Sequence, residues 1–372
     1  MGKALDDFVH SEKWWRTNIP SEIILSENGV SDSLRLLKER KGRPFFILDK
    51  ALVGQEKFKP FLEAEPDFLF LFDATASEPR TSDVDALVKL VKDKNLNPDV
   101  IVGVGGGGAM DLAKATGICL KNPKTAAEYQ GWGFDMLSGV DVWVVPTLIG
   151  TGAELTPIAV LRGPQKKLGI NTSLVAAKIA FIDPQLSEKA KKFNRFFTMM
   201  DCFYHHYEIT MSKTSAPDAI LDAQDGLTLS RSVLSRDLSE YSLEVAVTSA
   251  RASILGGSST IGGRVGASHA ISYGLSNAAP RLPHSVAVTI SMLGLEDLYS
   301  GGGYEETLKY LDVNGLPVPK ARDYDISASH IDGLVKTALG MDKLWLSHFG
   351  EGWEKTVTSS FLRGVYTKIV EA

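Results

Sequence analysis

Two side chains that can bind a metal ion lie one helical turn apart near the middle of the sequence. Asp201 and His205 are spaced i, i+4 in the segment MMDCFYHH, so a helix places both on one face. His269 and His284 follow in glycine-rich, apolar surroundings. One carboxylate with three imidazoles suits a divalent metal ion. Taken singly, each histidine is better explained as a packed core or surface side chain, and spacing alone does not join the two pairs. His206 faces about 100° away from His205 on a helix and is expected to pack.

A run of glycines stands where a predicted strand meets a predicted helix. Residues 103–108 read GVGGGG and are followed by AMDLAK. Glycines let a ligand approach the backbone, and the helix amino terminus offers free N–H groups beside a positive dipole end. These features favour a site for the pyrophosphate of a dinucleotide. The alternative is a glycine turn that only packs tightly.

Two further segments are candidates for nucleotide contacts. Asp49 ends the predicted strand PFFILD, where a carboxylate could accept hydrogen bonds from an adenosine ribose and repel a 2′-phosphate. A strand-end turn residue is an equally good interpretation of Asp49. The loop 146–154, PTLIGTGAE, follows another strand with hydroxyls and glycines, which suits the ligand crevice of an α/β sheet.

The first half of the chain alternates apolar strand patterns with helix patterns, which indicates an open, parallel α/β sheet. The helix pattern Ser82–Lys94 begins with a possible cap at Ser82 and an acid, Asp85, three residues later. The predicted strands are Pro44–Asp49, Asp67–Phe72, Val100–Val104 and Val142–Val145.

The residue types and their spacing change after the dipeptide Asp183-Pro184. Ala, Leu, Ser and Gly at helical spacing replace the β-branched runs, and the residue before a proline tends to leave the helical region. We therefore predict an α/β, Rossmann-like nucleotide-binding domain over residues 1–184. An all-α domain over residues 185–372 would carry the metal site and the catalytic groups.

Composition excludes several classes of protein. A net charge of −5 argues against broad binding to nucleic acid or to an anionic membrane surface. Cys119 and Cys202 are the only cysteines, which is too few for a disulfide scaffold. No apolar run reaches the roughly 18 residues of a membrane span, and no secretory signal is visible. The sequence thus predicts a cytoplasmic globular protein of about two domains.

Taken in order, these motifs resemble the iron-containing (group III) alcohol dehydrogenases, which share a fold with glycerol dehydrogenase and dehydroquinate synthase. The resemblance spans roughly residues 40–290 and rests on the glycine run with Asp111 and Lys114, the segment PTLIGTGAE, the pattern D-x-x-x-H-x-x-E, and the two later histidines. More narrowly, the chain resembles the branch formed by bacterial 3-deoxy-D-manno-octulosonate (Kdo) 8-oxidases in the segments YQGW, GTGAE, AVLRGPQKKLGIN, MDCFYHH and SHAISYGLS.

The resemblance implies an NAD(P)-linked oxidoreductase that acts on CH–OH, with roles for named residues of this chain. It implies a metal site of Asp201, His205, His269 and His284, holding Zn²⁺ or Fe²⁺, with Zn²⁺ favoured by the narrower branch. The implied cofactor residues are Asp49, Gly105, Gly106, Gly107 and Asp111 for the adenosine ribose and pyrophosphate, and Thr147, Thr151 and Lys167 for the nicotinamide side. Asp49 favours NAD over NADP.

The chain departs from the family pattern at two positions. Gly108 stands where the family usually has serine, and Tyr273 stands where most members carry a second histidine that relays protons. The Kdo-oxidase branch also has tyrosine there. Tyr273 is therefore our candidate catalytic residue, with a packed aromatic as the alternative.

The predicted reaction oxidises a primary alcohol of a sugar acid, the C8 hydroxyl of Kdo, to an aldehyde by hydride transfer, a step of lipopolysaccharide biosynthesis. Arg264 and Arg281 flank the late histidines, and one of them would anchor the carboxylate, unless both are surface residues. The alternatives are a sugar-phosphate cyclase of the dehydroquinate-synthase type, a broad-specificity alcohol dehydrogenase, and a silent nucleotide-binding protein on the same fold. A homodimer is the family's habit.

Overall fold

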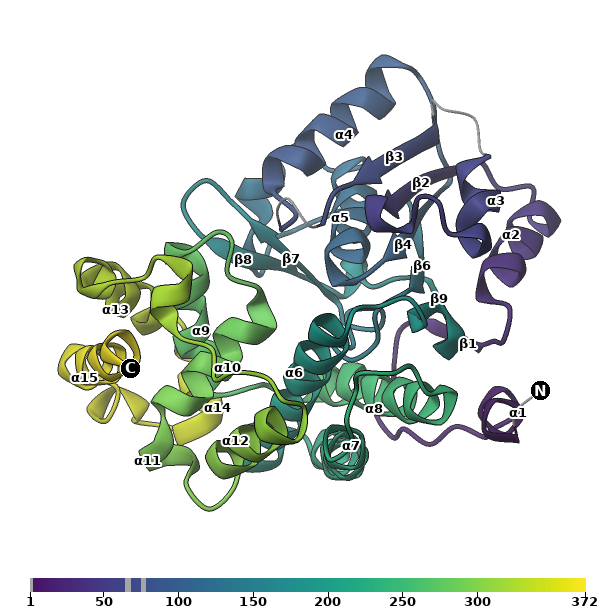
Figure 1. The fold of residues 1–372 in the computed structure, drawn as a ribbon. Coiled ribbons are helices and arrows are strands. Elements are labelled where there is room, and N and C mark those ends of the chain that lie inside the picture. The colour runs from purple at the N-terminus through teal and green to yellow at the C-terminus, as the bar shows by residue number, and fades with distance from the viewer. Residues whose placement is uncertain (1–2, 64–67, 75–77) are drawn as a thin grey trace. The chain divides into compact units, whose positions relative to one another are not determined.

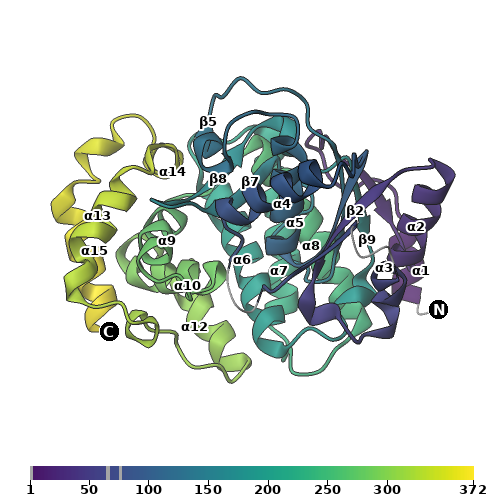
Figure 2. The same ribbon diagram turned by 90° about the horizontal axis from the view of Figure 1, so that it is seen from above.

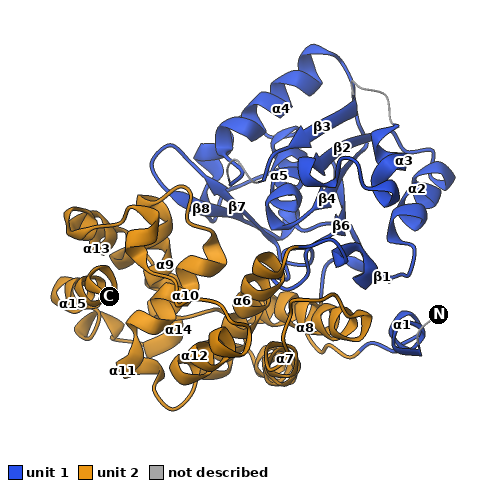
Figure 3. Ribbon diagram, viewed as in Figure 1, with its two compact units in different colours: residues 1–13, 19–190 blue, residues 14–18, 191–372 orange. Residues whose placement is uncertain are grey.

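The computed structural model describes residues 3–63, 68–74 and 78–372. Their contacts divide the chain into two compact units (Figure 3). The first consists of Met1–Lys13 with Ile19–Ala190, and the second of Trp14–Asn18 with Lys191–Ala372. The second unit therefore contains a short segment from near the start of the chain.

The first unit is built on a parallel six-stranded sheet, as the continuous apolar runs predict (Figure 1). Its strand order is β1-β9-β6-β4-β2-β3. The strands are β1 (Glu22–Leu25), β9 (Ile179–Ile182), β6 (Asp141–Pro146), β4 (Val100–Gly105), β2 (Pro44–Asp49) and β3 (Leu69–Phe72). The predicted strands correspond to β2, β3, β4 and β6, except that Asp67 lies outside the described residues. β1 and β9 are additional.

Helices cover both faces of this sheet (Figures 1 and 2). Residues that alternate along the central strands, such as Phe46 and Val102, form one buried cluster with α2 (Gly29–Glu39) and α3 (Lys59–Leu62). On the other face lies α5 (Gly107–Cys119), followed outward by α4 (Thr81–Asp93). This burial on both faces is why the strands read as unbroken apolar runs.

The start of α4 differs from the prediction. Ser82 is not the cap; the helix begins at Thr81, after Arg80. The acid that returns to the helix start is Asp83, whose carboxylate accepts a hydrogen bond from the Arg80 N–H at 2.9 Å. Asp85 instead accepts one from the Ala126 N–H, also at 2.9 Å. A tertiary contact thus uses the residue that the local pattern assigned to capping.

A second, three-stranded sheet follows the loop after β6 and was not predicted. It consists of β5 (Gly131–Trp132), β7 (Ile158–Arg162) and β8 (Lys167–Asn171), with β7 and β8 antiparallel. The fully buried Lys114 joins it to α5. Its ammonium donates to the backbone carbonyls of Ala153 and Ile158, the former at 2.9 Å, and lies 2.9 Å from the Asp111 carboxylate.

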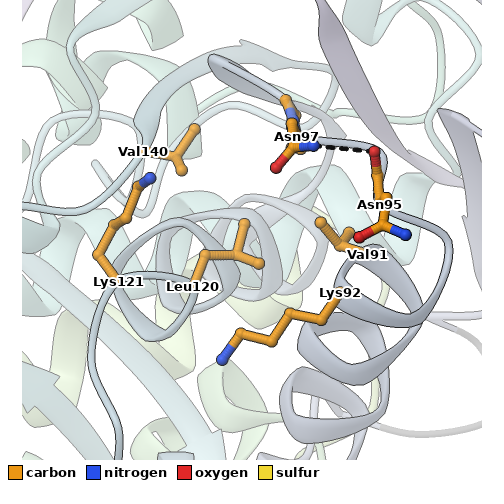
Figure 4. A pocket seen from close by; sticks show the side chains of 8 residues that line it. Val91, Lys92, Asn95, Asn97, Leu120, Lys121 and Val140 are labelled. Carbon is orange, nitrogen blue, oxygen red and sulfur yellow. Dashed lines mark hydrogen bonds between the residues drawn. The ribbon is translucent and has the colours of Figure 1, made fainter.

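A small surface pocket of about 320 Å³ lies at the amino-terminal edge of the main sheet (Figure 4). It is lined by Val91, Lys92, Asn95, Asn97, Pro98, Leu120, Lys121 and Val140. These residues end α4 and α5 or precede β4 and β6, so the pocket lies at the edge opposite the glycine run.

The second unit is helical, with no strand among residues 191–372. Its long helix α6 (Lys192–Met211) is buried on nearly every side by the surrounding helices, which explains why its apolar pattern is broad rather than striped. The other helices are α7 (Pro217–Leu234), α8 (Leu243–Gly262), α9 (Ala267–Ala278), α10 (His284–Gly294), α11 (Glu296–Tyr299), α12 (Gly303–Val313), α13 (Ile331–Leu339), α14 (Asp342–Phe349) and α15 (Ser359–Glu371). In the first unit, α1 spans Lys3–Val9.

The segment Trp14–Asn18 is bound to this unit through Asp222, a fully buried carboxylate on α7. Asp222 accepts hydrogen bonds from the Arg16 N–H at 2.9 Å, the Arg16 guanidinium at 3.1 Å and the Thr17 N–H at 3.1 Å. The Ser258 hydroxyl on α8 donates to the same carboxylate. The early segment therefore completes the hydrogen bonding of a charge buried between two helices.

His206 packs where α6, α7 and α8 meet. A Cβ added at Gly226 of α7 would lie 2.1 Å from the imidazole ring. We expect Gly226→Ala to destabilise the protein by about 1–3 kcal/mol, because the ring has no room to yield in a packed core. Chemical denaturation of the variant checks this. Gly333→Ala is the matched control, since a Cβ there meets nothing within 4 Å; an equal loss in both variants would contradict the expectation.

Burial lowers the pKa of His206 to about 3, well below the ordinary value of 6.5. The unfolded chain therefore binds a proton that the folded chain excludes between these two values. Stability from this group is complete above pH 6.5 and falls as the pH decreases toward 3. We expect thermal unfolding of His206→Gln to depend less steeply on pH between 6.5 and 4.5 than that of the wild type. Parallel curves for the two proteins would refute this.

Candidate functional site

The structure brings together the proposed metal ligands, all within the second unit. Ligand atoms of Asp201, His205 and His269 lie within 4.8 Å of one another. The Asp201 Oδ1 atom is 3.7 Å from His269 Nε2 and 3.9 Å from His284 Nε2. The rings of His205 and His269 are stacked, with centroids 4.9 Å apart. Helix α6 supplies Asp201 and His205, α9 supplies His269, and the first residue of α10 is His284.

Buried polar atoms at this cluster fit a bound cation. Asp201 Oδ1, His205 Nδ1 and His269 Nε2 are buried and, within the described ranges of the chain, have no hydrogen-bond partner. Burying such atoms unpaired costs free energy, and folded proteins rarely do so. A divalent metal ion would satisfy the carboxylate and imidazole atoms together, so the residues fit such a group.

The charges at the cluster also suit a cation. Burial alone would raise the pKa of Asp201, but the facing imidazoles of His205, His269 and His284 lower it far below its usual value. Burial lowers the pKa of His205, which keeps that imidazole neutral. Asp201 is thus an ionised carboxylate and His205 a neutral nitrogen donor. Against burial, Glu208 and Asp201 raise the pKa of His269 to about 9, so a metal ion bound at its imidazole would displace a proton.

Glu208 orients His269 from the side away from Asp201. Its Oε2 atom lies 2.6 Å from His269 Nδ1 and accepts a hydrogen bond from the Gly266 N–H at 2.9 Å. Its Oε1 atom accepts from the Ser268 N–H at 2.7 Å and from the Tyr299 hydroxyl. Burial would raise the pKa of Glu208, yet the His269 imidazole and these donors lower it to about 2. The carboxylate therefore fixes both the ring of His269 and the start of α9.

Sequence reasoning gave Glu208 no role of its own. The signal was present, because Glu208 is three residues after His205 and seven after Asp201, which is the same helix face. Tyr299 carries no such signal, since its place beside Glu208 depends on how α11 packs.

In the first unit, candidate cofactor residues gather at the carboxyl edge of the parallel sheet. Asp49 ends β2, and the glycine turn ends the neighbouring β4. Thr147 follows β6, and its N–H donates to the Gly105 carbonyl at 2.9 Å. The Thr151 hydroxyl oxygen lies 3.8 Å from the position that a Cβ on Gly107 would take. Ligands of open α/β sheets bind at this edge.

Gly105 is required by the backbone. Its φ of +151° lies in the region that favours glycine, and a Cβ there would lie 2.8 Å from the Cβ atoms of both Asp49 and Ala109. Helix α5 begins directly after this turn, with Gly106 as its N-cap. The first N–H groups of α5 therefore point out beside Asp49, which is where a phosphate group would be stabilised.

Asp49 also caps the turn at the end of its strand, which is the alternative interpretation considered for this residue from the sequence. Its Oδ1 atom accepts a hydrogen bond from the Ala51 N–H at 3.0 Å, which caps the turn after β2. Burial raises the pKa of the carboxyl group above its usual value. Capping and ribose binding are compatible, because a carboxylate can accept several hydrogen bonds.

The charged groups of Asp111 and Lys167 bind residues other than those of the glycine turn. Asp111 is buried; burial raises its pKa, while Lys114 acts against this, and its Oδ2 atom accepts from the Val160 N–H of β7 at 3.1 Å. The Lys167 ammonium of β8 lies 2.5 Å from Glu78 Oε1. Both charges are thus paired with groups of the small sheet or its neighbours.

Comparison with known proteins finds a family model that matches part of the chain, and several similar proteins. Residues 20–184 match the family described as iron-containing alcohol dehydrogenase. The chain is 25% identical over 282 residues to the NAD-dependent methanol dehydrogenase of Bacillus methanolicus, which covers 74% of the chain and 73% of that protein. It is 29% identical over 242 residues to the choline dehydrogenase of Bacillus subtilis, which covers 63% of the chain and 59% of that protein.

The fold agrees over almost the whole chain. The crystal structure of sulfoacetaldehyde reductase from Bifidobacterium kashiwanohense in complex with NAD⁺ matches with a TM-score of 0.78 and 19% identity, covering 97% of this chain and all of that one. The family model matches residues 20–184, and the likeness to this solved structure shows that the two chains share a fold. No helix in the described part of the chain is long and apolar enough to cross a membrane.

Both departures from the pattern of iron-containing alcohol dehydrogenases now have a structural setting. A Cβ at Gly108 would lie 3.2 Å from the Phe72 ring and 3.4 Å from Pro79, so a serine there would crowd both residues. Tyr273 lies one turn after His269 on α9, with its ring centroid 6.4 Å from that of His284. The tyrosine thus lies next to the cluster of predicted metal ligands, at the position where iron-containing alcohol dehydrogenases usually have a second histidine.

The two arginines that flank His269 and His284 in sequence differ in burial and in ion pairing. Arg281 is exposed, and its guanidinium pairs with Asp325 at 2.7 Å. Arg264 is half-buried in the connection between α8 and α9. Of the two, only Arg264 is placed inside the second unit near Tyr273.

Proposed function

We propose that this protein is a metal-dependent, NAD-linked dehydrogenase that oxidises the primary C8 alcohol of the sugar acid Kdo to an aldehyde. The observation that carries the metal-dependent part is the cluster of buried, unpartnered ligand atoms on Asp201, His205 and His269, with His284 beside it. The assignment of Kdo as the substrate rests on the resemblance of several segments, among them YQGW and SHAISYGLS, to Kdo 8-oxidases.

The ligand set would hold one divalent ion, Zn²⁺ or Fe²⁺. When bound, such an ion polarises an alcohol oxygen and lowers its pKa. The protein's part is to present one carboxylate and three imidazoles, and to fix His269 through Glu208. Tyr273 would pass the alcohol proton toward water, a role supported by the 6.4 Å between its ring centroid and that of His284. The alcohol carbon loses a hydride to NAD⁺, and its oxygen loses a proton.

The glycine turn and the start of α5 would hold the pyrophosphate of NAD, with Thr147 and Thr151 toward the nicotinamide. For Asp111 and Lys167 we propose an indirect role, since their charges are paired with Lys114 and Glu78 and support the strands beside the loop 146–154. A cytoplasmic homodimer is the state we propose by analogy with the family.

The test is a spectrophotometric assay with the purified protein, NAD⁺ and Kdo, with Zn²⁺ and Fe²⁺ supplied separately. We expect NADH to accumulate, and His269→Ala to abolish it together with metal binding. Turnover of simple alcohols but not of Kdo would assign a broad-specificity alcohol dehydrogenase. Conversion of a sugar phosphate without net NADH would assign a cyclase instead.

Asp49 sets the expected preference for NAD over NADP. A carboxylate at the end of β2 repels the 2′-phosphate of NADP, so Asp49→Ala should lower the ratio of kcat/KM for NAD⁺ to that for NADP⁺ by roughly tenfold or more. Asp99→Ala, at the opposite edge of the sheet, is the matched control and should leave the ratio as it is. An unchanged ratio in Asp49→Ala would remove Asp49 from the cofactor site.

A further inference from the structure

Arg264 is held rigidly by its backbone between α8 and α9. Its N–H donates to the Ser215 hydroxyl at 3.1 Å, and its carbonyl accepts from the Ser347 hydroxyl at 2.7 Å. Both backbone polar groups of Arg264 are therefore held by side chains of neighbouring segments. A ligand that binds this residue would meet a backbone that is already ordered.

The guanidinium of Arg264 is half-buried, and its nitrogen atoms are not among the fully buried polar atoms that lack a partner. Within residues 3–63, 68–74 and 78–372, no carboxylate pairs with it and no acceptor receives a hydrogen bond from it. Burial lowers the pKa of Arg264, and the Tyr273 phenol acts in the opposite direction. By contrast, Arg231 in the same unit makes two hydrogen bonds to Glu306, at 2.8 and 2.9 Å. A half-buried guanidinium with no carboxylate partner in the described residues keeps its donors available for an anionic ligand.

The position of Arg264 connects it to the metal cluster. Two residues later, the Gly266 N–H donates to Glu208, the carboxylate that holds His269. His269 itself lies in the first turn of α9, and Tyr273, one turn later, lies beside His284. The backbone of Arg264 is thus fixed next to the end of α9 that carries the predicted metal ligand His269.

We propose that Arg264 is the specificity-determining residue that binds the carboxylate of the alcohol substrate. The guanidinium presents a planar pair of donors that matches a carboxylate in a bidentate geometry. The inference rests on the proposed dehydrogenase function and deepens it, because it restricts the substrate to alcohols that bear a carboxylate. Arg281 is excluded from this role, since it is exposed and already paired with Asp325.

A matched pair of substrates tests the proposal. Kdo and its methyl ester carry the same primary alcohol and differ in the charge of the carboxyl group. We expect the wild type to prefer the acid, and Arg264→Gln to lower the acid-to-ester ratio of kcat/KM by about 10- to 100-fold, the loss expected for a hydrogen bond to a charged group. The loss should fall on KM rather than kcat. Arg264→Lys should restore part of the ratio, and Arg281→Gln should not change it.

The outcomes separate this proposal from the proposed function. Equal turnover of acid and ester by the wild type would overturn the anchor and leave the dehydrogenase standing. Equal losses for both substrates in Arg264→Gln, with less bound metal, would also overturn it, because the residue would then be structural. If no alcohol yields NADH, the dehydrogenase itself is wrong. Should Arg264→Gln fail to fold, the wild-type preference and Arg264→Lys still decide the matter.

Discussion

Lys114→Met should destabilise the protein by about 3–5 kcal/mol, which is a large part of the 5–15 kcal/mol that folded domains typically have. The substitution removes a fully buried ammonium that joins α5 to the segment 153–158. It also leaves the buried Asp111 carboxylate without its cation. Urea denaturation followed by circular dichroism measures the loss.

The double variant Lys114→Met, Asp111→Asn separates the two contributions. Because the amide carries no charge, the double variant should be more stable than Lys114→Met alone. Lys121→Met is the surface control at the end of the same helix and should change stability by less than about 0.5 kcal/mol. A loss below about 1 kcal/mol for Lys114→Met would show that the buried charge is not needed.

Glu208→Gln should weaken metal binding by about 10- to 100-fold, the usual effect of removing a group that orients a metal ligand. Each carboxylate oxygen faces two groups: Gly266 N–H and His269 Nδ1 at Oε2, and Ser268 N–H and the Tyr299 hydroxyl at Oε1. A glutamine replaces one oxygen with an NH₂ group that faces donors. Competition with a chelator for Zn²⁺ measures the affinity.

Excess metal distinguishes positioning from general damage in this variant. If Glu208 acts through His269, high Zn²⁺ concentrations should restore NADH formation by Glu208→Gln. Glu354→Gln, an exposed glutamate of the same unit, serves as the control and should bind metal as the wild type does. Wild-type affinity in Glu208→Gln would mean that His269 keeps its orientation without the carboxylate.

The parts of the fold that local pattern dictates were predictable. The central strands β2, β4 and β6 are buried on both faces and are therefore continuous apolar runs in the sequence. The glycine turn is recognisable from its run of glycines. The edge strand β1 and the strand β7 of the small sheet are only partly buried and carry polar residues, so their stability comes from pairing with other strands. No local pattern encodes such pairing.

The candidate site divides in the same way. The helix spacing of Asp201 and His205 predicted a shared face, while the approach of His269 and His284 depends on how α9 and α10 pack on α6. Family resemblance supplied what spacing could not. The difference between Arg264 and Arg281 was invisible in sequence, because it depends on burial and on Asp325, a residue 44 positions away.

The binding of Trp14–Asn18 to Asp222 has a consequence for how the chain acquires its structure. During synthesis, Arg16 leaves the ribosome long before Asp222 and Ser258 exist, so this segment must wait, unpaired, for its acceptor. The helical unit is consequently discontinuous along the gene. A truncated protein that starts at Lys191 would leave the buried Asp222 carboxylate without the N–H donors of Arg16 and Thr17. Producing the helical unit alone therefore requires the segment Trp14–Asn18, either fused to it through a linker or added as a separate peptide.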